Sequence, residues 1–184
     1  MSEFAQYAAV RPQLVRVGLV LGLSLVLAVS ARVSVPFWPV PMTLQTLAVL
    51  TIAGLGGPRV ATAAMLAYLA EGAIGLPVFA ATPERGLGLA YLAGPTGGYL
   101  LGMLAAAPLV GVLARRTAGR PVALLGAMTM GSVVVYAAGA AWLASYIGAA
   151  RAVALGVAPF LAGDAVKTAL AAAVVLAAGR PRRA

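Results

Sequence analysis

Long apolar runs, broken by short clusters of glycine, proline and arginine, dominate this chain of 184 residues. A helix that crosses a bilayer needs about 20 mostly apolar residues, and several of these runs reach that length. With 62% hydrophobic and 9% charged residues, the chain has too few polar side chains to cover the surface of a soluble protein. The sequence therefore predicts an all-α integral membrane protein.

The breaks between the runs predict six transmembrane helices in a single domain that covers residues 1–184. These helices are expected near residues 14–31, 43–53, 59–70, 97–114, 122–147 and 159–178. Because the first run is long enough to span and five others follow it, we expect a retained helix rather than a cleaved signal peptide. The second and third helices are shorter than a full span, so either they line a polar cavity or the protein is simply compact there.

The arginines lie between the apolar runs and set the predicted orientation. With the amino terminus inside, nine arginines lie inside and three outside, which is the asymmetry typical of membrane proteins. The inner arginines are Arg11, Arg16, Arg59, Arg115, Arg116, Arg120, Arg180, Arg182 and Arg183, and the outer ones are Arg32, Arg85 and Arg151. This pattern predicts two cytoplasmic termini, and it explains the net charge of +9 without nucleic acid as a partner.

Two connections are expected outside, residues 32–42 and residues 71–96. The second connection is long for a compact protein, and its aromatic and apolar residues are not typical of a disordered segment. We therefore expect it to form a lid over a pocket that opens to the outside.

The last predicted helix carries two ionisable residues, Asp164 and Lys167, on nearly the same face. An ionisable group in hydrocarbon costs about 3 kcal/mol by insertion scales, so such residues typically face the bundle interior and mark a ligand or ion path. Pro159 suits the first turn of this helix, which would place Asp164 near its positively polarised end. Both residues are candidates for substrate binding. The alternatives are a structural ion pair and a lysine that extends to the membrane surface.

Polar residues also mark the outer end of the second predicted helix. Thr43 and Gln45 would lie level with the charged pair in the predicted topology, and a glutamine offers both a donor and an acceptor to a ligand. Alternatively, Thr43 caps the helix and Gln45 is exposed.

The sequence contains no cysteine or histidine, which removes thiol and imidazole chemistry and the usual soft-metal ligands. We therefore expect no metal site and no cofactor, and an enzyme is disfavoured.

Small residues occur at four-residue spacing in two predicted helices, Gly18 and Gly22 in the first and Gly98 and Gly102 in the fourth. Such spacing lets helices approach closely in lipid. The neighbour is either another helix of this chain or a partner protein.

Four segments together are similar to the signatures of one family. In chain order they are Pro39–Thr46, Gly72–Phe79, Gly94–Tyr99 and Pro159–Lys167. In this order and spacing they resemble BioY, the biotin-specific membrane subunit, or S component, of energy-coupling-factor vitamin transporters. The resemblance extends over nearly the whole chain. It implies a six-helix S-component bundle in the bacterial cytoplasmic membrane that captures biotin from outside with high affinity.

The resemblance also implies roles for the charged pair. Asp164 would accept a hydrogen bond from a ureido N–H of biotin, and Lys167 would donate to the ureido carbonyl or to the carboxylate.

Biotin is a small ligand that needs few polar groups in an apolar pocket. Aromatic walls are expected from Phe79, Tyr91 and Tyr99. Arg85, in the predicted lid, either faces the carboxylate of biotin or is a solvated loop residue.

As partners, the resemblance implies a transmembrane scaffold subunit and a pair of cytoplasmic ATPases, with Gly18 and Gly22 as candidates for docking the scaffold. Lipid surrounds the bundle, and a homo-oligomer is left open. Three other functions remain as alternatives: an S component for another small vitamin, an intramembrane enzyme that uses Asp164 and Lys167 as acid and base, and a scaffold that binds no ligand.

Overall fold

The computed structural model describes residues 2–36 and 38–179, with side chains from residue 13 onward. Its elements are, in chain order, α1 (Ser2–Arg32), β1 (Ser34–Val35), β2 (Met42–Thr43), α2 (Gln45–Ala73), α3 (Gly88–Leu92), α4 (Gly97–Arg116), α5 (Pro121–Ile147), α6 (Ala149–Gly156), the 3-10 turn η1 (Ala158–Phe160) and α7 (Leu161–Ala177). In the described part of the chain, five segments are long and apolar enough to cross a membrane: Gln13–Arg32, Gln45–Ala73, Gly97–Arg116, Pro121–Ile147 and Ala149–Ala177. The predicted helical membrane fold is confirmed.

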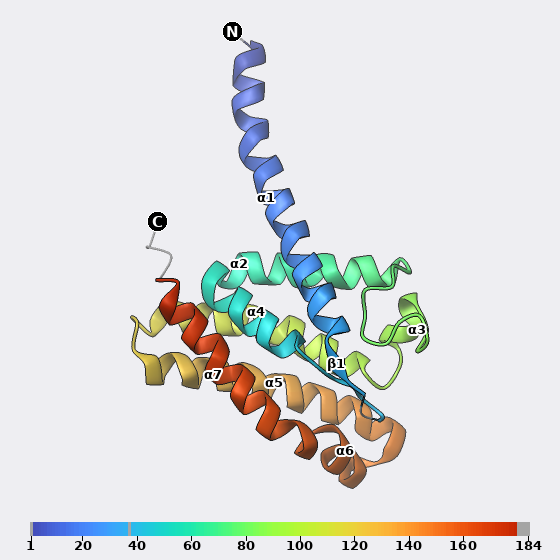
Figure 1. Cartoon of the computed structure of the whole chain (residues 1–184). Coiled ribbons are helices and arrows are strands. Elements are labelled where there is room, and N and C mark those ends of the chain that lie inside the picture. Colours follow the sequence, from blue (N-terminus) through green and yellow to red (C-terminus); the bar gives the residue numbers. More distant parts are fainter. Residues whose placement is uncertain (1, 37, 180–184) are drawn as a thin grey trace.

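The element α2 consists of two helices joined at Gly57. This glycine has φ 75° and ψ −176°, a conformation that a β-carbon disfavours, and the following Pro58 cannot donate a helical hydrogen bond. Figure 1 shows the two arms of α2, cyan and then teal, running in different directions. They correspond to the helices predicted near 43–53 and 59–70. Counted separately, they bring the long helices of the described chain to the predicted six, beside the short α3 and α6.

Three features of the fold differ from the expectation. The first helix already begins at Ser2 rather than near residue 14. The connection over residues 32–42 contains an antiparallel pair, in which Ser34 is opposite Thr43 and Val35 is opposite Met42. The connection before the last helix contains α6, which is too short to span and buries only two residues, Ala152 and Gly156.

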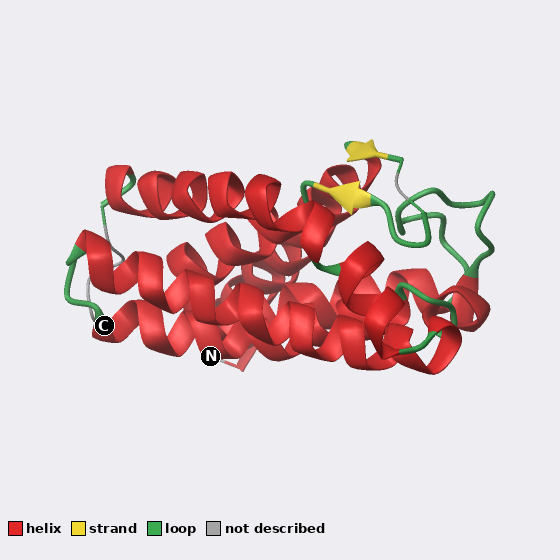
Figure 2. Ribbon diagram, turned by 90° about the horizontal axis from the view of Figure 1, so that it is seen from below, coloured by secondary structure: helices red, strands yellow, loops and turns green. Residues whose placement is uncertain are grey.

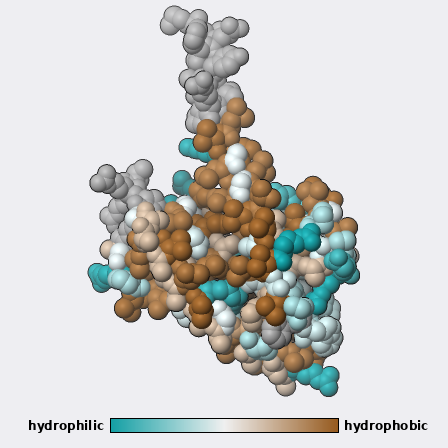
Figure 3. Space-filling model, viewed as in Figure 1, coloured by the Kyte–Doolittle hydropathy of each residue, from teal (hydrophilic) through white to brown (hydrophobic). Residues whose placement is uncertain are grey.

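Helix α1 joins the rest of the molecule through its C-terminal half. Ser24, Leu27 and Ala31 are buried there, whereas Leu14 is 64% exposed and Val15 is 71% exposed. Figure 1 shows α1 projecting from the bundle of α2, α4, α5 and α7, and Figure 3 shows apolar residues over much of the visible surface. Such a surface is unfavourable in water, and it suits a protein whose solvent is lipid.

Small residues bring α4 and α5 into close contact. A β-carbon added at Gly98 or Gly102 would lie 2.1 Å or 2.8 Å from the nearest atom of α5, so neither site can hold a larger residue without a shift. A β-carbon added at Gly18 or Gly22 of α1 would have no neighbour within 4 Å. The small residues of α4 therefore serve internal packing, whereas those of α1 lie on an open face.

The strands and the long connection between α2 and α4 lie together at one end of the bundle (Figure 2). Arg32, the last residue of α1, donates hydrogen bonds to two carbonyl oxygens of this connection, those of Pro77 and, at 2.7 Å, Thr82. Arg85 donates to the carbonyl oxygen of Pro39 at 2.8 Å. These contacts join the connection to the segments on both sides of it.

Candidate substrate-binding site

A cavity lies between the β1–β2 hairpin and the adjoining ends of α2, α4, α5 and α7. The cavity opens to the surroundings on one side. Its polar lining consists of Thr43, Gln45, Thr46, Thr96, Tyr136, Asp164 and Lys167, and its other lining residues are Val40, Pro41, Met42, Ala80, Tyr99, Leu100, Met103, Val135 and Phe160. A mostly apolar cavity with a few polar groups is the usual form of a small-molecule site.

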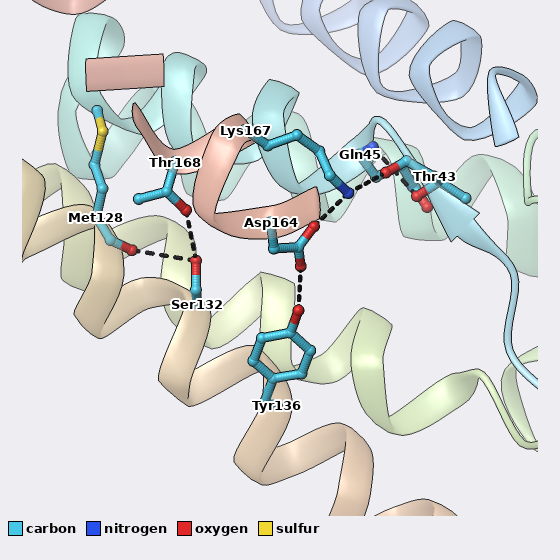
Figure 4. A network of polar contacts seen from close by, with 8 residues as sticks. All are labelled: Thr43, Gln45, Met128, Ser132, Tyr136, Asp164, Lys167 and Thr168. Atoms are coloured by element: carbon cyan, nitrogen blue, oxygen red, sulfur yellow. Dashed lines mark hydrogen bonds and ion pairs between the residues drawn. The ribbon is translucent and has the colours of Figure 1, made fainter. Parts of the chain in front are cut away.

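Asp164 and Lys167 form an ion pair in the wall of this cavity. They are only 7% and 8% exposed, and the ammonium contacts Oδ1 of the carboxylate. The hydroxyl of Tyr136 donates to Oδ2 at 2.5 Å, and Nζ of Lys167 donates to the carbonyl oxygen of Thr43 at 2.8 Å (Figure 4). The structure therefore places both charges inside the bundle, as the spacing predicted, and holds them from two neighbouring elements.

The local sequence places Asp164 at the end of α7 that suits a carboxylate. Asp164 lies in the first turn of α7, which follows the turn η1 with Pro159, and the positive end of a helix stabilises a carboxylate. A buried ion pair is tolerated when further hydrogen bonds satisfy its remaining donors and acceptors. Tyr136 and Thr43 supply such bonds here, which leaves one ammonium donor and several carboxylate lone pairs for a ligand.

Thr43 and Gln45 both line the cavity, but in different ways. The hydroxyl of Thr43 accepts from the backbone N–H of Gln45 at 3.2 Å, while the carbonyl of Thr43 accepts from Lys167. Leu44, not Thr43, is the N-cap residue of α2, and it makes no side-chain capping bond. Gln45 is buried rather than exposed, and its amide donates to the hydroxyl of Tyr68 at 2.8 Å. Tyr68 in turn donates to the carbonyl oxygen of Val78, so Gln45 connects the cavity to the outer connection.

Tyr99 is the one predicted aromatic residue that lines the cavity. Its hydroxyl donates to the carbonyl oxygen of Gly156 at 2.8 Å. A β-carbon at Gly139 or at Gly156 would lie 2.3 Å from the Tyr99 side chain, so the absence of side chains at both positions makes room for it. Tyr99 therefore offers the cavity a fixed aromatic wall rather than a free hydroxyl.

Phe79 and Tyr91 were expected at the ligand, but the structure places both outside the cavity lining. Phe79 packs between two rings, stacked on Tyr91 with centroids 4.8 Å apart and edge-on to Tyr68 at 5.3 Å. Burial raises the pKa of the Tyr91 hydroxyl, which donates to the carbonyl oxygen of Ala80 at 2.9 Å. The two aromatic side chains thus form the core of the outer connection, where each buries its apolar surface against the other.

Arg85 also lies outside the cavity lining. Its bond to the Pro39 carbonyl attaches the outer connection to the segment that precedes β2. The side chain is exposed, yet it is engaged in holding two segments together.

Sequence reasoning missed Tyr136, which the structure brings to Asp164. A tyrosine in the middle of an apolar helix is a weak signal, since many such residues lie at a membrane interface. One turn away along both helices, the hydroxyls of Ser132 and Thr168 lie 3.3 Å apart, and both side chains are buried (Figure 4). The contact between α5 and α7 is therefore polar at two successive levels.

Comparison with known proteins decides the family. A sequence model of the BioY family matches residues 5–183. The chain belongs to the BioY family. A probable biotin transporter BioY of Pyrococcus horikoshii is 38% identical over 144 residues, covering 78% of this chain and 83% of the relative. The biotin transporter BioY of Thermotoga maritima is 36% identical over 165 residues, covering 89% of this chain and 94% of the relative.

A solved structure also matches this BioY-family chain. The crystal structure of the S-component for biotin from an ECF-type ABC transporter superposes with a TM-score of 0.80 at 25% identity, covering 91% of this chain and 92% of that one. The family consists of transporter components, and with its long apolar helices the chain is a multi-pass membrane protein. The S-component-like bundle expected from the four motifs is confirmed.

Proposed function

We propose that this BioY-family protein is the substrate-specific subunit of a vitamin transporter and that its substrate is biotin. The observation that carries the proposal is the buried pair of Asp164 and Lys167 in the wall of an otherwise apolar cavity. The names of the relatives, which are biotin transporters, and the structural match to a biotin S-component support this substrate. The protein would capture biotin with high affinity outside the cell and release it inside.

The chemistry of biotin suits the residues of the cavity. Biotin combines a cyclic urea, an apolar thioether ring and an aliphatic acid. In the proposed complex, Asp164 accepts a ureido N–H and Lys167 donates to the ureido carbonyl. Tyr99, Met103 and Phe160 provide apolar surface for the ring and the aliphatic chain. Phe79, Tyr91 and Arg85 support the site indirectly, by holding the outer connection in place.

In this proposal the whole chain, residues 1–184, is one transmembrane domain with both termini in the cytoplasm. The support is the distribution of arginines, because the inner segments would hold nine and the outer segments three. Of the inner arginines, Arg180, Arg182 and Arg183 lie outside the described residues, as does the side chain of Arg11. The cavity then opens to the outside, at the end of the bundle that holds the hairpin and the long connection.

We further propose that the protein works with a transmembrane scaffold subunit and a pair of cytoplasmic ATPases, which supply the energy for uptake. The open face around Gly18 and Gly22 supports α1 as the docking element, because small residues let another helix approach closely. Otherwise this face is covered by lipid or by a second copy of the chain.

Binding of radiolabelled biotin to the purified protein tests the substrate. Removing one partner of a buried, hydrogen-bonded charge pair costs about 2–5 kcal/mol, so Asp164→Asn and Lys167→Ala are each expected to weaken binding by about 30-fold or more. Glu84→Gln, which neutralises an exposed carboxylate of the outer connection, is the matched control and should bind as the wild type does. Unchanged affinity in both site variants, or equal competition by thiamine or riboflavin, would contradict the proposal.

A further inference from the structure

Lys167 lies between two hydrogen-bond acceptors in the cavity wall. On one side its Nζ donates to the carbonyl oxygen of Thr43 at 2.8 Å, and on the other it contacts Oδ1 of Asp164 (Figure 4). An ammonium group has three N–H donors, so one donor remains after these two contacts. The result is a row of groups in the order acceptor, donor, acceptor.

The hairpin explains why the Thr43 carbonyl faces Lys167. The backbone N–H of Leu44 donates to the carbonyl oxygen of Val33 at 3.1 Å, so residues 33 and 44 form a hydrogen-bonded pair of the antiparallel ladder. Hydrogen-bonded and non-hydrogen-bonded pairs alternate, so the next pair, Ser34 and Thr43, is non-hydrogen-bonded. The carbonyl of Thr43 therefore points away from β1, and its oxygen can accept a second hydrogen bond besides that from Lys167.

The row matches one edge of a cyclic urea. In that ring a carbonyl group lies between two N–H groups, which gives the order donor, acceptor, donor. We infer that the carbonyl oxygen of Thr43 accepts the second ureido N–H of the substrate, while Asp164 accepts the first and Lys167 donates to the carbonyl between them. This inference rests on the proposed function. With the Thr43 carbonyl included, the site hydrogen-bonds both ureido nitrogen atoms rather than one.

Tyr136 takes a different role because it lies on the far side of Asp164. A carboxylate can only accept hydrogen bonds, so the phenol is the donor in its 2.5 Å contact with Oδ2. Tyr136 thus fixes the carboxylate from α5 and leaves Oδ1 for Lys167 and the ligand. It is a positioning residue, outside the row that contacts the urea.

The row predicts a narrow specificity for the head group. A ligand that lacks one N–H forms one hydrogen bond fewer in a buried site, and sites built to hydrogen-bond a group discriminate strongly against analogues that lack it. The test compares biotin with two analogues, each methylated on one of the two ureido nitrogens. Wild-type protein should bind each analogue at least about tenfold more weakly than biotin.

This comparison separates the inference from the proposed function. If biotin itself does not bind, the proposed function fails. If biotin binds and either methylated analogue binds equally well, the site does not hydrogen-bond both ureido N–H groups. The inference is then overturned, while biotin stays the proposed substrate.

The variant Tyr136→Phe tests whether the second ureido N–H is accepted by the Thr43 carbonyl or by the phenol oxygen of Tyr136. As a positioning residue, Tyr136 affects all three ligands through Asp164, so the variant should weaken their binding by the same factor. If instead one methylation penalty disappears in Tyr136→Phe, the phenol oxygen accepts that N–H, and the assignment to Thr43 is wrong.

Infrared spectroscopy observes the backbone acceptor directly. Protein labelled with carbonyl-¹³C threonine should show a shift of the labelled amide band when biotin is added. The variant Thr43→Ser keeps the hydroxyl and the fold of the hairpin but carries no label at this position, so the shift should be lost. No shift in the wild type, or an equal shift in Thr43→Ser, would overturn the inference.

Discussion

At the scale of single residues, the charged pair is stabilised from both of its ends. Tyr136 binds one oxygen of Asp164, and Thr43 binds the ammonium of Lys167, so α5, β2 and α7 all contribute to one cluster. Charges that are taken from water must be paired and hydrogen-bonded, and this cluster meets that condition before any ligand arrives. The ligand then meets groups that are already oriented, which lowers the entropy cost of binding.

Because Lys167 lies between two acceptors, biotin binding should depend on the compact size of its ammonium group as well as on its charge. The variant Lys167→Arg keeps the charge but replaces a compact ammonium with a larger planar guanidinium, which cannot occupy the same gap. We expect biotin to bind at least about tenfold more weakly, because the guanidinium cannot place a donor between the two acceptors as the ammonium does. Arg151→Lys, at an exposed residue of α6, is the control. Wild-type affinity in Lys167→Arg would contradict this role.

The sequence predicted part of this cluster because part of it is local. The spacing of Asp164 and Lys167 fixes their common face within one helix turn, so their pairing follows from helix geometry alone. Tyr136 lies on another helix, and the acceptor at Thr43 is a backbone atom, which any residue type carries. Both contacts arise from tertiary packing, so the sequence pattern does not predict them.

At the scale of elements, the turn in α2 shapes the bundle. Gly57 permits a conformation that other residues adopt only with strain, and α4 packs against the turn so closely that a β-carbon at Gly111 would lie 2.5 Å from the nitrogen of Pro58. The side chain of Arg115 lies over Gly57 itself, where a β-carbon would be 2.1 Å from its Nη2. The turn therefore needs small residues on both contacting elements.

The variant Gly57→Ala tests this packing. It combines a backbone conformation that is essentially restricted to glycine, and that costs about 1–3 kcal/mol, with a clash against Arg115, so we expect a lower thermal unfolding midpoint in detergent. The control is Gly126→Ala in α5, where the new β-carbon would have no neighbour within 4 Å. Alanine favours a helix over glycine by up to about 1 kcal/mol, so the control should be as stable as the wild type or more so. Equal midpoints for Gly57→Ala and the wild type would show that the turn tolerates a β-carbon.

The elements that the sequence predicted well are those whose signal is the length of an apolar run. The helices predicted near 97–114 and 122–147 lie within α4 and α5 with ends displaced by at most two residues, because Gly, Pro and Arg mark these ends. The β1–β2 pair and α6 went unpredicted, since two-residue strands and a helix of eight residues have no comparable pattern. The aromatic cluster around Phe79 was assigned to the ligand because residue type alone does not tell which neighbour a ring will meet.

At the scale of the whole molecule, polar and apolar features are separated along the bundle. The hairpin and the long connection lie together at one end (Figure 2), and residues of the hairpin line the cavity. Arg115 and Arg116 in the last turn of α4 and Arg120 just before α5 flank the turn between these helices, and α4 begins at the long connection, so this turn lies at the opposite end. Exposed apolar side chains cover the faces between these ends, where Val133 is 52% exposed and Val166 is 68% exposed. In the proposed orientation the two ends lie on opposite sides of the membrane, and chemical labelling can test this.

Because the chain contains no cysteine, one introduced cysteine gives a single labelling site. Glu84 in the outer connection and Arg120 before α5 are both exposed, and the proposed orientation places them on opposite sides of the membrane. A maleimide that cannot cross membranes should therefore label Glu84→Cys in intact cells and should label Arg120→Cys only after the cells are permeabilised. The loss of one inner arginine leaves eight against three, so the orientation itself should hold. Labelling of Arg120→Cys but not of Glu84→Cys in intact cells would reverse the orientation and place the cavity on the cytoplasmic side.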